Sequence, residues 1–352
     1  MNQTVEQCRK ALQQQWAGQR IHLGHGAGGK QMDELISGVI APLFGMTGGP
    51  LEDAARLDVA GLGPGRLAMT TDGYVVTPLQ FPGASIGHLA VNGTVNDLAV
   101  SGAQPLYLSC SLIMEEGLAI ETLIDILADM AQAAQQAGVQ IVTGDTKVVE
   151  RGHADGLFIT TAGVGWIAQG VDLGIHRIQP GDRLLLSGPL GEHGAAILIA
   201  RGELALESDL HSDCQPLHGL VKAMLDAGEV HAIRDVTRGG LGSVANEFAQ
   251  GSNLGIVLDE AAIPVPEEVH GFCDVLGLDV LYLANEGKLL AAVAADAADA
   301  ILAAMRARPE GEQAAVIGEV VEDHAGRVVV RTTFGSHRIL DKLVGEQLPR
   351  IC

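Results

Sequence analysis

The chain has 352 residues, 47% of them hydrophobic, and its 22 lysines and arginines against 43 aspartates and glutamates give a formal net charge of −21 at pH 7. At roughly 100–200 residues per domain this length suggests two domains, and the negative charge argues against nucleic acid and anionic membranes as partners, because like charges repel. An anionic ligand such as a nucleotide would need local help from a divalent metal, a glycine-rich loop or a few placed cations.

Apolar patterns predict the elements in chain order. The first twenty residues form an N-terminal extension with one short helix, followed by a short strand over 21–23 and a glycine-rich loop over 24–30. Apolar runs predict strands over residues 66–71, 105–114, 139–143, 157–165, 183–187, 233–235 and 255–259. Helical spacing predicts helices over residues 31–40, 85–100, 120–137, 192–201, 217–227 and 241–250.

We place the domain boundary near residues 170–182. Both halves mix strands and helices without a strict βαβ rhythm, which favours an α+β class over a doubly wound sheet.

The glycine-rich loop has the spacing of a phosphate-binding loop but lacks one part of it. Residues 24–30 fit G-x-x-x-x-G-K, yet Gln31 stands where a P-loop has the Ser or Thr that holds magnesium. Backbone N–H groups ahead of a helix can still bind phosphate. An ordinary turn with an exposed lysine is about equally compatible with this loop taken alone.

Hard oxygen ligands follow apolar segments at several places. We expect Asp72 and Asp145 to end strands, while Asn96 and Asp97 lie on the helix between them. One such aspartate would usually be a cap. Taken together, they favour octahedral Mg²⁺ that bridges phosphate oxygens.

Two further motifs lie in the second half. The segment 233–241 predicts a strand that leads into Asp235, Thr237 and Arg238, and then a glycine pair beginning with Gly239 that opens a helix. This arrangement suits anions but is also compatible with a simple capped helix. Glu286 follows an apolar run and could act as a base, although a surface turn is the preferred interpretation of that segment by itself.

The cysteines indicate a reduced, cytoplasmic protein. Five dispersed cysteines without a Cys-x-x-Cys pair argue against disulfides and structural zinc. The polar N-terminus lacks the apolar core of a signal peptide, and no run of about 18 uncharged apolar residues is present. Cys352 is the last residue and follows Pro349, so we expect an extended arm whose thiol could carry a group between two sites.

Five segments together carry a resemblance to a known family. They are DGYVVTPLQFPGASIGHLAVNGTVNDLAVSGAQPLYLS, IVTGDTKVVERG, RDVTRGGL, LANEGK and the terminal PRIC, which is highly specific. Over residues 21–352 the chain resembles the HypE family of hydrogenase maturation factors. That family belongs to the superfamily of aminoimidazole ribonucleotide synthetase and selenophosphate synthetase. Residues 1–20 are outside the resemblance.

The resemblance implies an activity and partners. A carbamoyltransferase, HypF, would load a carbamoyl group onto Cys352, and the protein would use ATP to dehydrate the S-carboxamide to an S-cyanide. The cyano group would then pass to iron on a HypC–HypD complex, to become a ligand of the [NiFe]-hydrogenase centre. Residues 21–175 would be an ATP-binding and dimerisation domain, 176–340 a second domain and 341–352 a flexible tail, with homodimers formed through the N-terminal sheets.

The resemblance also implies site residues. Lys147 and Glu286 would polarise the carboxamide and remove its proton, with Cys352 as the carrier. The metal ligands would be Asp72, Asp97 and Asp145. The nucleotide would contact Gly26, Gly28, Gly29, Lys30, Asn96, Asp235, Thr237, Arg238 and Gly239.

Two alternatives remain at this stage. Another ATP-using enzyme of the superfamily, such as thiamine-monophosphate kinase or selenophosphate synthetase, would share the aspartates but needs no terminal cysteine. A non-enzymatic maturation scaffold would leave the aspartates unexplained, and one thiol makes a poor metal site.

Overall fold

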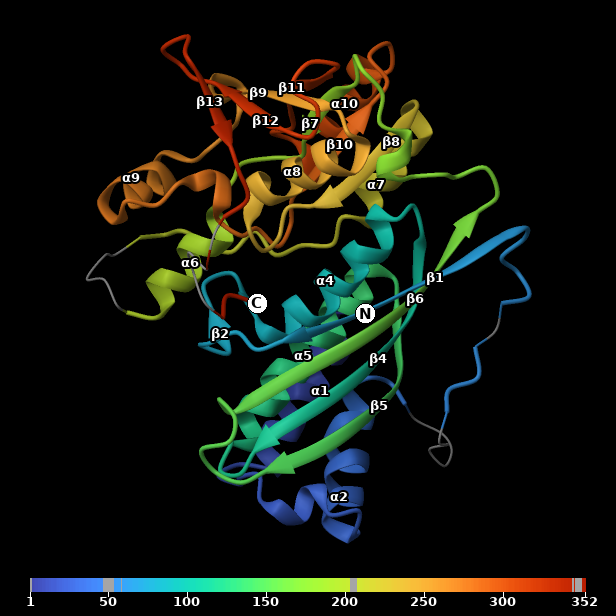
Figure 1. Cartoon of the computed structure of the whole chain (residues 1–352). Helices are drawn as coiled ribbons and strands as arrows, with labels where there is room; N and C mark the ends of the chain where they lie inside the picture. The colour runs from blue at the N-terminus through green and yellow to red at the C-terminus, as the bar shows by residue number, and fades with distance from the viewer. Residues whose placement is uncertain (1, 47–53, 58, 203–207, 344, 346–349) are drawn as a thin grey trace.

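Two sheets organise the chain (Figure 1). The computed structural model describes residues 2–46, 54–57, 59–202, 208–343, 345 and 350–352. The first sheet has four strands in the order β1-β6-β4-β5, and the second has seven in the order β13-β12-β9-β11-β7-β10-β8. Each sheet has its own hydrophobic core, which confirms the predicted two-domain α+β class.

The first sheet is mixed. Its strands are β1 (Gly65–Tyr74), β6 (Leu157–Ala168), β4 (Gln104–Glu115) and β5 (Gln140–Val149). The β1–β6 and β6–β4 pairs are antiparallel, and β5 runs parallel to β4. A two-stranded ribbon, β2 (Gln80–Phe81) and β3 (Ala84–Ser85), leads into helix α4 (Ile86–Val100).

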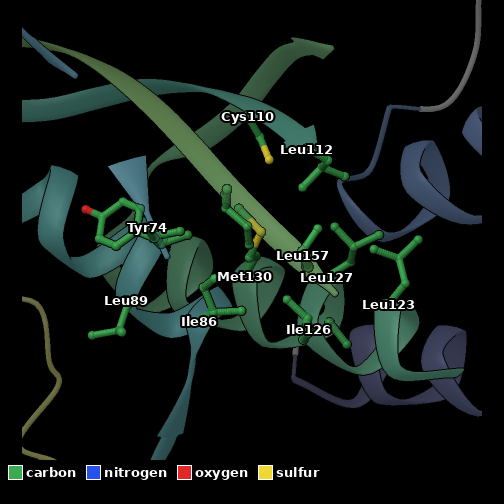
Figure 2. Packing of buried hydrophobic residues seen from close by; sticks show 14 of the residues in the cluster. Tyr74, Ile86, Leu89, Cys110, Leu112, Leu123, Ile126, Leu127, Met130 and Leu157 are labelled. Atoms are coloured by element: carbon green, nitrogen blue, oxygen red, sulfur yellow. The ribbon is translucent and has the colours of Figure 1, made fainter. Parts of the chain in front are cut away.

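Helices α4 and α5 (Ile120–Ala137) cover one face of this sheet. Helix α4 begins where the Ser85 hydroxyl accepts a hydrogen bond from the Gly87 N–H at 3.2 Å. Helix α5 ends at Gly138, whose φ of +68° is the left-handed conformation of a C-terminal cap. The core between them is formed by buried side chains shown in Figure 2, among them Ile86, Leu89, Leu112, Leu123, Ile126, Leu127, Met130 and Leu157.

The other face of the first sheet is open along β1. Side chains alternate across a strand, so Thr70, Asp72 and Tyr74 face the helices while Leu67 and Met69 face outward. The outward pair is 59% and 76% exposed. A row of exposed apolar side chains on a strand is the kind of surface that a partner usually covers.

The second sheet has helices on both faces. Its strands are β13 (His337–Leu340), β12 (Val328–Arg331), β9 (Gly255–Asp259), β11 (Ala315–Val321), β7 (Arg183–Leu186), β10 (Leu289–Val293) and β8 (Val230–Asp235). Helices α7 (His218–Ala227) and α10 (Ala298–Arg306) pack on one face against Leu185, and α8 (Gly240–Ser252) packs on the other against Leu184 and Leu186.

The remaining elements are short or peripheral. They are α1 (Asn2–Gln15), η1 (Leu23–Gly26), α2 (Lys30–Leu35), η2 (Ile36–Ile40), α3 (Ala41–Leu43), η3 (Ile175–Arg177), α6 (Glu192–Ala200), η4 (Glu260–Ala262), α9 (Glu267–Leu276), η5 (Val280–Tyr282) and η6 (Pro309–Gly311). Within the described residues, no helix has the length and apolar character needed to cross a membrane.

Most predicted elements are present, but three details were wrong. Residues 21–23 form no strand, because the glycine-rich segment turns into the 3₁₀ helix η1. Strands β1 and β5 do not end at Asp72 and Asp145, since pairing with β6 and β4 continues through both residues. Asp235 does end its strand.

Helix α1 packs on the first domain. Leu12 and Trp16 belong to the same core cluster as α5, and Asp125 of α5 accepts hydrogen bonds from Arg9 Nε at 2.7 Å and Gln13 Nε2 at 2.6 Å. Residues of the predicted extension therefore complete the core under α5.

We expect Leu12→Ala to destabilise the first domain by about 2 kcal/mol or more, because a buried leucine would be replaced by a partly collapsed cavity. Both tryptophans, Trp16 and Trp166, lie in this domain, so urea unfolding followed by tryptophan fluorescence measures it. Leu23→Ala is the matched control, since Leu23 is 44% exposed and should change stability by less than about 0.5 kcal/mol. Equal effects of the two variants would show that α1 is not part of the core.

Candidate functional site

The candidate site lies where α4 meets the second domain. Helix α4 contacts both α7 and β8, and its last turn packs Ala99 into the core of the second domain. Asn96 joins the two domains directly. Its Oδ1 accepts from Leu217 N at 2.7 Å, and its Nδ2 donates to the carbonyl oxygens of Gln215 at 3.0 Å and Glu286 at 3.4 Å. Through these hydrogen bonds Asn96 connects the two domains.

Three aspartates from different elements influence one another here. Asp72 lies on β1, Asp97 on α4 and Asp235 at the end of β8. Burial raises the pKa of Asp235 to about 7, and the charges of Asp97 and Asp72 add to the effect. Burial and then Asp72 also raise the pKa of Asp97, although Thr70 donates a hydrogen bond to its Oδ2 at 2.7 Å.

Glu286 extends this acidic cluster inward. Its side chain is buried, and burial, followed by the charges of Asp213, Asp235 and Asp72, raises its pKa well above the ordinary value. Arg238 opposes the shift. The surface turn preferred for this segment from sequence alone is therefore wrong.

The C-terminal arm, defined here as residues 350–352, ends beside Glu286. Figure 1 shows the C-terminus close to α4 and β2, between the two domains. Ile351 is buried in the first-domain core, and a terminal carboxylate oxygen of Cys352 accepts from Val75 N at 3.2 Å. Burial and then the charge of Glu286 raise the pKa of the Cys352 thiol to about 12. Residues 344 and 346–349 of the predicted tail are outside the described residues.

A cavity of ≈ 480 Å³ opens beside the arm. It is lined by Cys352, Arg238, Gly239, Val75 and Tyr282, among others. Gly239 has a φ of +79° at the start of α8, which an L side chain would strain. The structure thus brings Arg238 and Gly239 of the predicted group to the cavity with Cys352, whereas Thr237 of the same loop does not line it.

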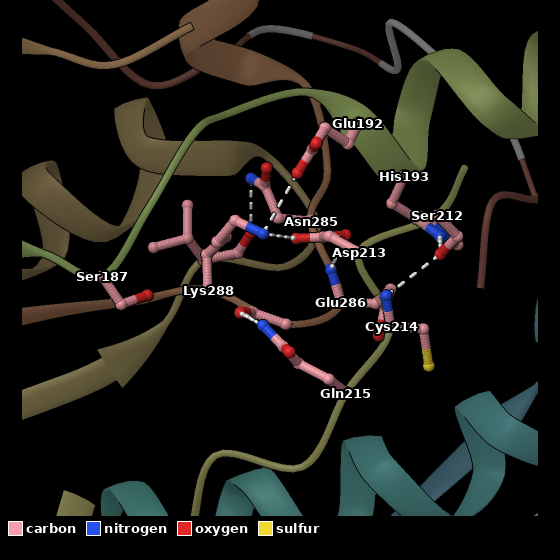
Figure 3. A network of polar contacts seen from close by, with 12 residues as sticks. Ser187, Glu192, His193, Ser212, Asp213, Cys214, Gln215, Asn285, Glu286 and Lys288 are labelled. Atoms are coloured by element: carbon pink, nitrogen blue, oxygen red, sulfur yellow. Dashed lines mark hydrogen bonds and ion pairs between the residues drawn. The ribbon is translucent and has the colours of Figure 1, made fainter. Parts of the chain in front are cut away.

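A buried lysine organises the loop that carries Glu286 (Figure 3). Lys288 Nζ lies 3.0 Å from Asp213 Oδ2 and 3.2 Å from Glu192 Oε2. Asp213 Oδ1 in turn accepts from the Glu286 backbone N–H at 3.0 Å. The sequence analysis assigned no role to Lys288 or Asp213. Lys288 stands in the LANEGK motif, but Asp213 lies in a polar loop without a local signal.

The other predicted residues lie on the far side of the first domain. Lys147 Nζ is 2.5 Å from Asp145 Oδ2 on β5, and this contact lowers the pKa of Asp145. Gly26 packs against the same strand, because a Cβ there would lie 2.6 Å from Val148 N. Lys30 is exposed and 3.6 Å from Glu34. Gly28 and Gly29 are also exposed, and a Cβ added to either would meet no other atom within 4 Å.

One chain does not bring Asp145 to Asp72 and Asp97. Across the sheet, Asp72 on β1 is aligned with Thr161 on β6, Cys110 on β4 and Gly144 on β5. Asp145 follows Gly144, and because successive side chains alternate between faces, it points to the face opposite Asp72. Strand β5 is three strand spacings from β1, which separates the backbones at Asp72 and Asp145 by about 14 Å, at ~4.8 Å per spacing. Lys147 is on that same face and away from Glu286. A single metal site with all three aspartates, and a joint action of Lys147 and Glu286, would thus need a second chain.

The cluster of Asp72, Asp97 and Asp235, called here the first cluster, fits Mg²⁺ that is shared with phosphates. In the described part of the chain no three His, Cys, Asp or Glu side chains converge into a preformed metal site. Mg²⁺ commonly takes only one or two protein carboxylates together with waters and substrate phosphates. Burial, and then neighbouring aspartates, raise the pKa of Asp97 and Asp235, and Arg234 opposes both shifts. A bound cation would stabilise the ionised form of these carboxyl groups.

Family models match both halves of the chain. The N-terminal domain of AIR synthase related proteins matches residues 51–167, and the C-terminal domain of the same group matches residues 179–331.

Individual proteins match over nearly the whole length. Carbamoyl dehydratase HypE of Rhodobacter capsulatus is 55% identical over 337 residues, which is 95% of this chain and 98% of that protein. A crystal structure of the hydrogenase maturation protein HypE in complex with ATP is similar with a TM-score of 0.87 at 46% identity, covering 94% of this chain and 99% of that one. A crystal structure of a HypE–HypF complex is similar with a TM-score of 0.76 at 43% identity, covering 79% and 90% of the two chains.

We expect Asp235→Asn to stabilise the metal-free protein at pH 8. The folded state raises the pKa of Asp235 from 3.8 to about 7, so the native state binds a proton more tightly than the unfolded state, and stability falls as the pH rises through that window. The gain should be on the order of 2–4 kcal/mol at pH 8 and smaller at pH 5.5.

Urea unfolding in EDTA at the two pH values measures this difference. Asp226→Asn is the control, because the Asp226 side chain is 66% exposed and should change stability little at either pH. A gain from Asp235→Asn that does not depend on pH would contradict the explanation by charge.

Proposed function

This chain belongs to the HypE family of AIR synthase-related proteins, and from this membership we infer that it is an ATP-dependent carbamoyl dehydratase of [NiFe]-hydrogenase maturation. It converts an S-carboxamide on Cys352 to an S-cyanide. The observation that supports this use of Cys352 is its docked position, with the thiol in the electrostatic range of Glu286 and Arg238.

The chemistry requires three bonds to break at the carboxamide, which are the C–O bond and both N–H bonds. Transfer of the γ-phosphoryl group to the amide oxygen, with loss of one N–H proton, forms an imidoyl phosphate. The C–O bond then breaks, phosphate leaves with the electron pair, and a base removes the second N–H proton to give the nitrile. Phosphoryl transfer itself needs positioning and charge neutralisation.

The residues of the first cluster suit these needs. Asp72 and Asp97, with Asp235 close by, would hold Mg²⁺, which when bound neutralises charge on the transferred phosphate. Arg238, Thr237 and the N–H groups at Gly239 would contact phosphate oxygens at the start of α8. Glu286 would remove the proton, because a buried carboxyl with a raised pKa is a stronger base once ionised.

Another copy of the chain would contribute the residues that lie far from Glu286, namely those of β5 and the glycine-rich loop. The exposed apolar side chains of β1 give a homodimer a surface to bury. Lys147 and Asp145, with Gly26, Gly28, Gly29 and Lys30 nearby, would then complete the partner's site. Lys147 would polarise the carboxamide and Asp145 would reach the metal.

The carrier function needs two partners. HypF forms a complex with a protein of this family and would load the carbamoyl group in this chain as well. A HypC–HypD complex would receive the cyano group. The cytoplasmic location expected from the sequence is part of the same proposal.

Incubation with HypF, carbamoyl phosphate and ATP should add one carbamoyl group and then remove one water, with both changes on the peptide that ends in Cys352. Intact and peptide mass spectrometry measures this. Cys352→Ser should show neither change. Cys214→Ser is the matched control, because Cys214 is the other thiol whose pKa is raised by burial and by Glu286, and it should retain both. Modification of an internal cysteine would refute the assignment.

Mixing two inactive variants tests the shared site. Lys147→Ala and Cys352→Ala should each abolish dehydration, but dimers with one chain of each type keep one complete site. Random exchange of subunits should restore about a quarter of the wild-type rate. Met69→Asp, placed in both chains on the outward face of β1, should separate the dimer in light scattering and prevent the rescue. A lack of rescue despite proven mixed dimers would place Lys147 and Cys352 in the same chain's site.

A further inference from the structure

A buried histidine contacts the arm next to the carrier thiol. His193 lies near the start of α6, is fully buried and has its Nε2 at 2.9 Å from the carbonyl oxygen of Ile351. Its ring packs edge-on against Phe81, with ring centroids 5.6 Å apart. The chemistry described above gives this histidine no role.

Neighbouring groups fix which nitrogen of His193 carries the proton. The Ser212 hydroxyl oxygen accepts from Cys214 N–H at 3.2 Å, and Ser212 Oγ lies 2.8 Å from His193 Nδ1. The carbonyl oxygen of Ile351 can only accept, so Nε2 carries the proton and donates it there. Nδ1 of the neutral ring is then an acceptor, and the Ser212 hydroxyl donates to it. Burial lowers the pKa of His193 and so favours this neutral form.

The other contacts of the arm are more exposed. Arg201 donates to the carbonyl oxygen of Arg350 at 2.7 Å. The Arg350 side chain forms an ion pair with Asp155, and each of these two side chains is 42% exposed. Water can replace such contacts when the arm leaves. The carbonyl of Ile351 lies in a dry environment, where a hydrogen bond is stronger and its loss leaves an unsatisfied group.

The same short segment also supports the proposed base. Ser212 and Cys214 flank Asp213, which accepts from the Glu286 backbone N–H and pairs with Lys288. Figure 3 shows His193 beside Ser212, and Asp213 close to Glu286 and Lys288. The group that orients His193 and the group that holds the Glu286 loop are therefore adjacent residues of one segment.

We propose that His193, oriented by Ser212, is a positioning residue that holds the C-terminal arm in its docked place and so sets the Cys352 thiol beside Glu286. The inference rests on the proposed use of Cys352 as the carrier. One neutral hydrogen bond suits an arm that must dock for dehydration and leave for loading, because it biases the docked state without a buried charge that would have to be separated on release.

The test compares His193→Leu, His193→Gln and Ser212→Ala in the full-length protein. Alkylation by iodoacetamide, followed at Cys352 by peptide mass spectrometry, reports how often the arm leaves, since the docked thiol is partly buried and its pKa is raised to about 12. Loss of the hydrogen bond in His193→Leu should accelerate alkylation at Cys352 roughly fivefold. His193→Gln keeps an N–H near the Nε2 position and should restore most of the protection, while Ser212→Ala should give an intermediate rate.

A second measurement separates positioning from general damage. Single-turnover dehydration of protein already carbamoylated at Cys352 should slow in His193→Leu and recover in His193→Gln, whereas the rate of loading by HypF should not fall. His231→Gln is the matched control, since His231 is equally buried but contacts Asp182 in the second domain, and it should leave both Cys352 rates unchanged. Alkylation of Cys8, far from the arm, gives the internal standard.

Two results would overturn the proposal. One is wild-type alkylation and dehydration rates in His193→Leu. The other is the same change in His193→Gln as in His193→Leu, which would indicate packing and not the donated hydrogen bond. If the wild-type protein shows no carbamoylation or dehydration at Cys352, the proposed function fails, while the alkylation rates still decide whether His193 holds the arm.

Discussion

The placement of several acidic side chains where little water reaches them is the constraint on which the rest of the site depends. Asp72 and Asp97 come from the first domain, and Asp235 and Glu286 come from the second. Burial raises the pKa of Asp97, Asp235 and Glu286, and the charges of the neighbouring aspartates add to each shift. Holding like charges together out of water costs free energy. The two domains must therefore be joined firmly elsewhere, and the hydrogen bonds of Asn96 together with the packing of α4 provide that joint.

Two cationic side chains near the acidic cluster, Lys288 and Arg238, have different contacts. Lys288 is buried and satisfies Asp213 and Glu192, so it stabilises the loop of Glu286 without facing the cavity. Arg238 lies at the cavity and lowers the pKa of both Glu286 and Cys352. The remaining negative charge suits a divalent cation with phosphates, which is the ligand that a strongly acidic protein can accept only with such local help.

The arm docks at this charged site largely through uncharged contacts. Its docking uses apolar burial of Ile351 and hydrogen bonds to main-chain carbonyls, and its one ion pair lies at the surface. Under the proposed function, an arm that moves between a loading enzyme and a dehydration site would benefit from such contacts, because the hydrogen bond to Ile351 involves no charged side chain. Lys147 and Glu286 lie on different sides of one chain, so their proposed joint action requires a second copy.

The sequence by itself determined much of this protein. Local apolar periodicity predicted nearly all the helices and strands, because amphipathic patterns are properties of short segments, and the segments from DGYVV to the terminal PRIC identified the family. Apolar runs also drew attention to Asp235 and Glu286, although the pattern by itself favoured a surface turn for Glu286 and only the family resemblance implied its role. Only the tertiary structure decided that Glu286 is buried, that Asp145 and Lys147 face away from Asp72, that Asp213 contacts the Glu286 backbone and that His193 contacts the arm. Those outcomes depend on strand register and on contacts between residues far apart in the chain, where a shift by one residue reverses the face of a side chain, and no local pattern carries that information.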